Sequence, residues 1–317
     1  MDDAASPSPA DPSTHDPSTH DPWPALPLEQ WQDTRDTLHL WTQVVGKVRL
    51  ALAPAVNHWW HVPLYVDSVG LTTSLMPYRG LGVEVVFDLT SHQLLVRTTT
   101  GGRRRMALEP RSVADFTGEF RSHLTELGVD VPITGTPVEL AEAIPFDEDH
   151  EHASYDPDAA HRFWTSLVSA HRVLSRFRGE FRGKASPVHF FWGAFDLATT
   201  RFSGRPAPPH PGGVPHCPDW VMTEAYSEEL SSCGYWPGGA AEGAFYAYAY
   251  PEPSGYRHRP VEPAPAAFDV GLGEFLLPYA DVRTAEDPDA HLLRFLTTAH
   301  AAAVATAGWP DRLGVPA

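Results

Sequence analysis

The residues best suited to chemistry follow one apolar run in the second half of the chain. His189, Asp196, Arg201 and Arg205 interrupt a phenylalanine-rich stretch that extends from Pro187 to Arg205. Charged groups inside a buried run are costly unless they are paired or face a cavity. We therefore predict one buried strand that carries these four side chains to an aromatic-walled pocket. The alternative is a core strand whose polar groups bond the backbone.

General acid/base chemistry is what this set of residues suits. A histidine beside a carboxylate can move a proton, so His189 with Asp196 or Glu228 forms the predicted catalytic group. Arg201 and Arg205 can bind a carboxylate or phosphate through two parallel hydrogen bonds, and they predict an anionic ligand. The other predicted ligand-binding residues are Glu224, Tyr226 and Trp236.

Two further hypotheses concern the same region. The proline- and glycine-rich loop 203–219 contains His210 and His216, weak candidates for metal ligands because their spacing fits no tight structural zinc motif. The first is therefore a metal-dependent enzyme that combines these histidines with His189 and either Glu224 or Glu228. The second is a non-catalytic scaffold that meets another protein through an aromatic surface. No phosphate loop, nucleophile elbow or dinucleotide fingerprint occurs, so the sequence leaves the cofactor unknown.

Composition excludes several classes of protein. The 317 residues include 40 acidic and 23 basic side chains, a net charge of -17 that argues against nucleic acid as a partner. No apolar stretch is long enough to span a membrane, and the N-terminus lacks the pattern of a signal peptide. Cys217 and Cys233 make no metal-ligand spacing and predict reduced thiols. We expect a soluble cytoplasmic protein with a small-molecule ligand; the oligomeric state stays open.

Helical stripes and alternating runs outline two similar halves. Amphipathic helices are predicted over 28–52, 112–127, 157–181 and 288–307, with Ser112, Asp156 and Asp287 as caps. Strands are predicted over 57–66, 83–89, 94–100, 105–108, 229–236, 244–250 and 274–277.

The two halves resemble each other in sequence. Trp41-Thr42 corresponds to Trp164-Thr165, and His61 corresponds to His189. We predict an α+β fold of two related halves, each helix–antiparallel strands–helix in two-layer packing. A pseudo-twofold axis would place the His61 and His189 strands side by side, with a ligand pocket between the halves. The predicted organisation is a disordered tail (1–24), the first half (25–135), an acidic connector (136–155) and the second half (156–317).

Several longer motifs resemble a known bacterial family. They include Asn57-His-Trp-Trp-His-Val62, Pro187-Val-His-Phe-Phe-Trp-Gly193 and Ala244-Phe-Tyr-Ala-Tyr-Ala-Tyr250. On these motifs the chain resembles the domain of unknown function 5996, over nearly everything after the tail. The resemblance implies no activity. It does imply a Tyr-Ser-His-Glu run in which position 228 is histidine, whereas this chain has Glu228.

Overall fold

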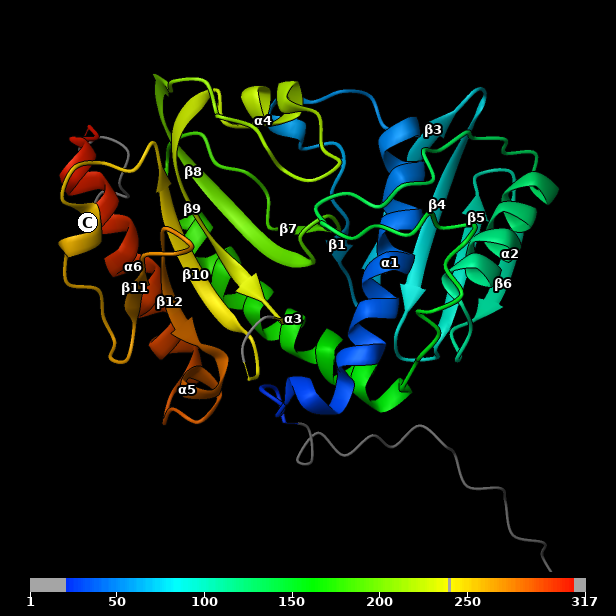
Figure 1. The fold of residues 1–317 in the computed structure, drawn as a ribbon, viewed down its shortest axis with the longest axis horizontal. Helices are drawn as coiled ribbons and strands as arrows, with labels where there is room; N and C mark the ends of the chain where they lie inside the picture. The colour runs from blue at the N-terminus through cyan, green and yellow to red at the C-terminus, as the bar shows by residue number, and fades with distance from the viewer. Residues whose placement is uncertain (1–20, 239–240, 311–317) are drawn as a thin grey trace, which may run out of the picture.

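Two antiparallel sheets lie on either side of a central helix. The computed structural model describes residues 21–238 and 241–310. Helix α1 (Leu28–Leu52) lies between the sheets (Figure 1), and its residues 37–49 are buried except for the partly exposed His39. A helix buried on all sides is typical of the core of a large protein. Of the predicted tail, residues 1–20 lie outside the described residues, whereas Trp23 packs on Phe245 and Tyr279.

The first sheet and helix α2 enclose one side of α1. The strands are β1 (Tyr65–Val66), β2 (Gly70–Thr72), β3 (Met76–Tyr78), β4 (Leu81–Asp88), β5 (Gln93–Thr98) and β6 (Arg103–Ala107), in the order β1-β2-β4-β5-β6 with β3 paired to β4. Phe87 of β4 stacks on Phe116 of α2 (Val113–Glu126), which in turn stacks on Trp41 of α1. This aromatic stack joins the sheet to both helices.

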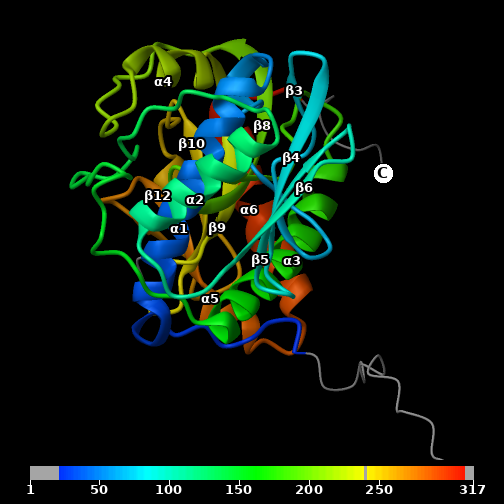
Figure 2. The ribbon, with the colours of Figure 1, turned by 90° about the vertical axis from the view of Figure 1, so that its right-hand side faces the viewer.

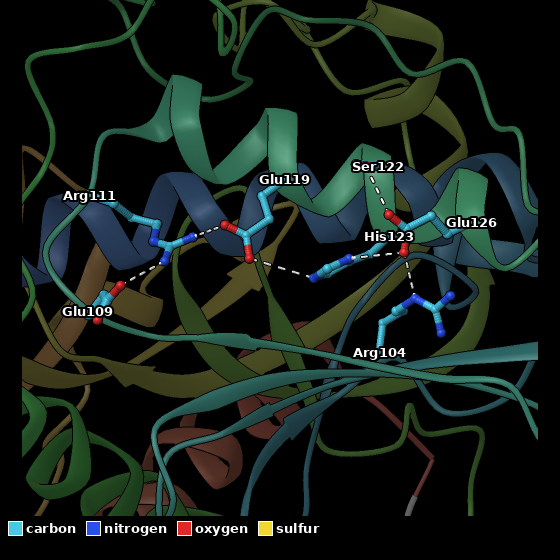
Figure 3. A network of polar contacts seen from close by, with 7 residues as sticks. All are labelled: Arg104, Glu109, Arg111, Glu119, Ser122, His123 and Glu126. Atoms are coloured by element: carbon cyan, nitrogen blue, oxygen red, sulfur yellow. Dashed lines mark hydrogen bonds and ion pairs between the residues drawn. The ribbon is translucent and has the colours of Figure 1, made fainter.

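Charged residues tie the surface of α2 to its surroundings (Figure 3). Arg104 of β6 bonds Glu126 at 2.6 Å, and Arg111 bonds Glu119 at 2.6 Å. The ring of His123 lies between these acids, 3.6 Å from Glu119 and 3.9 Å from Glu126. The acids are largely exposed, and exposed ion pairs contribute little to stability. The network therefore orients α2 on the sheet and indicates no ligand site.

The second sheet has helices on one face. Its strands are β7 (His189–Phe191), β8 (Asp196–Pro206), β9 (Glu228–Trp236), β10 (Ala244–Tyr250), β11 (Ala267–Asp269) and β12 (Glu274–Pro278), in the order β11-β12-β10-β9-β8-β7. Helix α3 (Pro157–Gly179) packs on β8 and β9, and α6 (Pro288–Ala307) packs on β9 and β10. Figure 2 shows α4 (Asp219–Ala225) at the end of the molecule opposite α5 (Tyr279–Arg283).

The two sheets meet at one isolated bridge. Phe190 donates to the Leu64 carbonyl at 2.8 Å, and Leu64 donates to the Phe190 carbonyl at 2.9 Å. The segments that contain His61 and His189 therefore lie side by side. The α+β class, the antiparallel sheets and the division into two halves are all as the sequence predicts.

Helix ends also agree with the sequence signals. Ser112 accepts the Asp115 N–H, Asp156 accepts the Asp158 N–H, and Asp287 accepts the Ala290 N–H. Gly308 ends α6 with a positive φ of 60°, which glycine adopts without a steric penalty. Among the described helices, none combines the length and apolar character needed to cross a membrane.

Three predicted elements need correction. The single strand over 187–205 is wrong: residues 192–195 turn the chain, with Phe195 at a φ of 59°, and form the hairpin β7–β8. The strand over 57–66 begins instead as the 3-10 turn η2 (Asn57–Trp59), because His58 and Trp59 have left-handed φ angles. The loop placed at 203–219 begins after Pro206, since β8 continues through a bulge at Gly204.

Candidate functional site

The face of the second sheet turned away from α3 and α6 is polar. Successive side chains of a strand alternate between faces. In β10 the residues Phe245, Ala247 and Ala249 are buried on the helix side, whereas Tyr246, Tyr248 and Tyr250 are half-buried on the opposite side. We call this opposite side the outer face. Its other members include Asp196, Thr200, Gly234 and Ser232, with the Thr200 and Ser232 hydroxyls 2.9 Å apart.

Asp196 begins β8 on the outer face. Its Oδ2 accepts a short hydrogen bond from the Tyr246 hydroxyl, and the residue is 7% exposed. Burial raises the pKa of Asp196 to about 6, although the Tyr246 hydrogen bond opposes the shift. A carboxyl group in this state is half-protonated near pH 6, whereas an ordinary aspartate is almost fully ionised at that pH.

Two glutamates share the electrostatic environment of Asp196. Desolvation by surrounding protein atoms raises the pKa of Glu139 to about 7 although the residue is exposed, and the negative charge of Asp196 adds to the effect. Burial also raises the pKa of Glu274 to about 7, again with a contribution from Asp196. Glu139 has a left-handed φ of 61°, and a Cβ added to Gly193 would lie 2.0 Å from its Oε1. The absence of a side chain at Gly193 therefore makes room for this carboxylate.

Helix α1 presents a polar stripe to the same region. His39 donates from Nε2 to the Gly193 carbonyl at 2.8 Å, and burial lowers the pKa of His39 to about 4. Gln43 donates to the Val138 carbonyl at 2.9 Å and accepts the Val138 N–H at 2.8 Å. Lys47, one turn further, donates to the Thr134 hydroxyl at 2.9 Å. The stripe thus holds the chain segment that carries Glu139.

The loop 207–218 and Tyr226 connect the outer face to the Glu139 segment. The Glu139 N–H donates to the Pro215 carbonyl at 2.8 Å, and the Tyr250 hydroxyl donates to the Pro208 carbonyl at 3.0 Å. The Tyr226 hydroxyl lies 2.8 Å from that of Tyr248. We call residues 134–139 the Glu139 segment. The outer face, the Glu139 segment, the polar stripe and loop 207–218 together form what we call the polar layer.

Glu224 and Glu228 belong to a different cluster near η2. Lys184 donates to Glu228 at 2.5 Å and to His58 Nε2 at 2.6 Å. The His58 N–H donates to the Glu224 carboxylate at 2.8 Å. These contacts hold the left-handed turn at His58 against α4 and the start of β9. In the described part of the chain, no contact joins Glu228 to His189, contrary to the sequence prediction.

Arg201 and Arg205 face the helices, away from Asp196. Arg201 is 5% exposed, donates to the Phe177 carbonyl and lies 3.4 Å from the centre of the Phe177 ring. Burial lowers the pKa of Arg201 to about 10. Arg205 donates to Glu229 at 2.6 Å and to the Ala307 carbonyl at the end of α6 at 2.7 Å. Both guanidinium groups have partners within the fold.

His189 is buried without a partner. It is 0% exposed, and neither ring nitrogen has a hydrogen-bond partner in the part of the chain that the structure describes. The ring packs edge-on against Tyr65 and Phe191. Burial, with smaller contributions from Arg49 and Arg178, lowers the pKa of His189 to about 3, so the imidazole is neutral. No contact joins it to Asp196 in the described chain.

The histidines predicted as metal ligands do not form a metal site in the described residues. His210 accepts the Gly212 N–H at 3.0 Å and packs on Tyr226, whereas His216 is exposed. Trp236 is half-buried at the end of β9. Within the described ranges no group of three or more His, Cys, Asp or Glu residues could hold a metal ion. Cys217 and Cys233 are both free thiols.

Sequence reasoning missed several members of the polar layer. His39, Gln43 and Lys47 recur every four residues opposite the apolar stripe of α1, and that spacing could have identified a second functional face. The alternation of tyrosine and alanine over 244–250 marks the outer face in the same way. Glu139 had no local signal, because it lies in an irregular, proline-containing segment far in sequence from Asp196.

Comparisons with known proteins give a family and no activity. The model of a family of unknown function, domain of unknown function 5996, matches residues 23–314. Neither a curated protein nor a solved structure matches the chain.

Proposed function

Because the chain belongs to the domain of unknown function 5996 family, which supplies no activity, we propose a function from the polar layer alone. The protein binds a small polar molecule between its two halves and acts on it by acid–base catalysis. Asp196 and Glu139 are the proton-transferring groups, and Tyr226, Tyr246 and Tyr248 orient the ligand. Asp196 and Glu139 take the place of His189 and Glu228 in this role, because His189 has no hydrogen-bond partner among the described residues and Glu228 pairs with Lys184.

The observation that carries the proposal is the buried Asp196 carboxyl group, which is hydrogen-bonded to Tyr246 and near enough to Glu139 and Glu274 for its charge to raise the pKa of each. Asp196 and Glu139 have pKa values of about 6 and about 7, and each lies near the operating pH at which proton transfer is most efficient. No ion pair to either carboxylate occurs within residues 21–238 and 241–310. Carboxylates that repel each other without a neutralising cation lower the free energy of unfolding. Such arrangements are concentrated at functional sites.

Glu139 is open to solvent, so a ligand can reach it, while desolvation by the surrounding protein raises its pKa. The outer face offers hydroxyl and carboxyl oxygens, so it favours a ligand rich in hydrogen-bond donors, such as a hydroxylated compound. The anionic ligand expected from Arg201 and Arg205 receives no support from their positions.

Thermal-shift screening tests this function. Polar metabolites, hydroxylated compounds first, would be screened for those that raise the Tm of the wild type. We expect Glu139→Gln and Asp196→Asn to lose these shifts, since each alters a carboxyl group at the site. Glu148→Gln, an exposed carboxylate of the connector, serves as the matched control and should keep them. Shifts that persist unchanged in both site variants would place the ligand elsewhere and contradict the proposal.

We also propose an internal duplication and a cytoplasmic location. The strand orders β1-β2-β4-β5-β6 and β7-β8-β9-β10-β12 correspond, and a helix precedes and follows each series. Equivalent order in both sheets supports descent from one repeated unit. The free state of Cys217 and Cys233 supports a reducing compartment.

A further inference from the structure

Lys47 is a buried ammonium group without a carboxylate partner. It lies on α1 and is 4% exposed. Its Nζ donates to the Thr134 hydroxyl at 2.9 Å and lies 5.9 Å from the centre of the Phe146 ring. Among the described residues no ion pair engages it, and the ionisable group that influences its charge is the Cys217 thiol. Burying an unpaired charge is unfavourable, so its presence calls for a reason.

The composition of the chain makes this lysine more informative. Of the 23 basic residues, 21 are arginine and two are lysine, Lys47 and Lys184. Where a position needs positive charge alone, arginine evidently suffices in this protein. An ammonium differs from a guanidinium in its chemistry, because it can lose its proton and become a nucleophile near neutral pH. Lys184 has an ion pair with Glu228, whereas Lys47 has none in the described chain.

We infer that Lys47 is a reactive amine of the polar layer that binds the carbonyl group of a ligand as an imine. This inference rests on the proposed function and narrows its ligand class to hydroxylated aldehydes or ketones. The hydroxyl groups would bond the tyrosines and carboxyl groups of the outer face. The carbonyl carbon would reach Nζ of Lys47 near Thr134 and Cys217.

The covalent step needs no oxidant or metal. The lone pair of neutral Nζ attacks the carbonyl carbon, and the π electrons of the carbonyl move to its oxygen. A proton passes from nitrogen to that oxygen and gives a carbinolamine. The hydroxyl group then takes a proton from water and leaves as water, the nitrogen lone pair forms the C=N bond, and the N–H proton returns to solvent. One amine and one carbonyl compound thus give one imine and one water.

Burial makes the neutral amine available. Desolvation lowers the pKa of Lys47 to about 8, and the Cys217 thiolate would oppose this effect. At pH 8 about half of Lys47 would therefore be neutral, compared with less than about 1% of an ordinary lysine. The alternative role is structural, since Lys47 and Gln43 both attach the 134–138 segment to α1.

Reductive trapping distinguishes these roles. The full chain would be treated at pH 8 with glyceraldehyde and sodium cyanoborohydride, and modified lysines would be located by peptide mass spectrometry. We expect Lys47 to be modified at least about ten times faster than Lys184, which is the internal control. Propanal, which lacks hydroxyl groups, should modify Lys47 more slowly than glyceraldehyde does.

Variants keep the test independent of folding. Lys47→Arg retains the positive charge and N–H donors, and Lys47→Met retains the apolar stem; either variant that folds should lose the fast modification. Modification of Lys184 without Lys47 in the wild type would overturn the inference. That result would leave the proposed function standing if thermal shifts still depended on Glu139, because those shifts report non-covalent binding.

Discussion

Glu139 is held in a conformation that no contact of its own side chain explains. Its backbone has a positive φ, its carboxylate lies over Gly193, and the pKa is raised to about 7. Residues placed at a cost to stability tend to serve function, and their replacement then stabilises the fold. Asp196 has the same character, since burial raises its pKa as well.

Glu139→Gln should therefore raise stability at alkaline pH. The folded pKa lies above the unfolded value of 4.5, so the destabilisation by this carboxylate grows as pH rises from about 4.5 to about 7 and stays constant above that. Because the side chain is exposed, we expect a modest Tm gain of about 2–4 °C at pH 8 and almost none at pH 5. Scanning calorimetry at both pH values measures it. A Tm gain of equal size at pH 5 would point to a cause other than charge.

His189 should be replaceable by an apolar residue. Both ring nitrogens lack partners, so His189→Leu removes unsatisfied polar atoms at similar volume and should be neutral or stabilising at pH 7. His189→Ala should instead cost about 2–5 kcal/mol because it leaves a cavity. The folded pKa of about 3 lies below 6.5, so wild-type stability falls as pH drops below 6.5, and the advantage of His189→Leu should grow. Urea denaturation at pH 7 and pH 5 tests this; a large loss in His189→Leu would show a polar role.

Arg205 should matter for stability rather than for ligand binding. Arg205→Ala removes hydrogen bonds to Glu229 and to the end of α6, and should cost about 1 kcal/mol. Arg205→Lys keeps the charge and should recover part of that loss. Ligand-induced thermal shifts should be the same in both variants as in the wild type. Loss of those shifts in folded Arg205→Ala would restore the arginine to a binding role.

At the residue scale, Asp196 and Tyr226 of the predicted set lie in the polar layer, whereas Arg201 and Arg205 have partners on the helix side of the sheet. Charged residues in an apolar run indicate that a partner exists, and they do not indicate on which face of the strand it lies. Arg201 and Asp196 are five residues apart in β8 and point to opposite faces. An undetected turn at Gly193 separates His189 from both.

At the element scale, α1 has different partners on its two sides. Its aromatic and branched residues pack against the first sheet and α2, while the polar stripe faces the Glu139 segment. Gly46 allows this close packing, because a Cβ there would lie 2.4 Å from the Trp192 ring. The helix thus sets the position of the β7–β8 turn as well as that of the polar layer.

Gly46→Ala should destabilise the protein despite the higher helix propensity of alanine. Displacing the Trp192 ring should cost about 1–3 kcal/mol, more than the gain of about 1 kcal/mol from propensity. Gly118→Ala on α2 is the matched control, since nothing lies within 4 Å of its added Cβ, and it should stabilise by up to about 1 kcal/mol. Equal effects of the two substitutions in chemical denaturation would contradict the packing argument.

The helices and strands were easier to predict from the sequence than the way in which they pack together. Helices α2 and α6 have capping residues, and helix α1 and strand β10 have a regular hydrophobic pattern, so the ends of all four elements were predicted closely. The turn of the hairpin β7–β8 has no Asn-Gly or Pro-Gly signal. It depends instead on Phe195 in a left-handed conformation that tertiary packing supports, so it could not be predicted from local sequence. The short helices α4 and α5 also lack distinct periodic patterns.

At the scale of the whole molecule, the two halves should not fold separately. Trp23 precedes the first half yet packs on Phe245 and Tyr279 of the second, and α1 contacts α3. A fragment of residues 21–135 should therefore give a poorly dispersed NMR spectrum, and the full chain should melt in one transition. A fragment with native-like dispersion would show that the halves are independent domains.

The bridge between Leu64 and Phe190 has a mechanical consequence. Each sheet is continuous within itself, while hydrogen bonding from one to the other passes through this single pair in the described strands. A rotation of the halves about the bridge would therefore break fewer backbone hydrogen bonds than a separation within either sheet. The polar layer lies between the two halves, so a rotation about this hinge would widen or narrow the approach to the proposed ligand site.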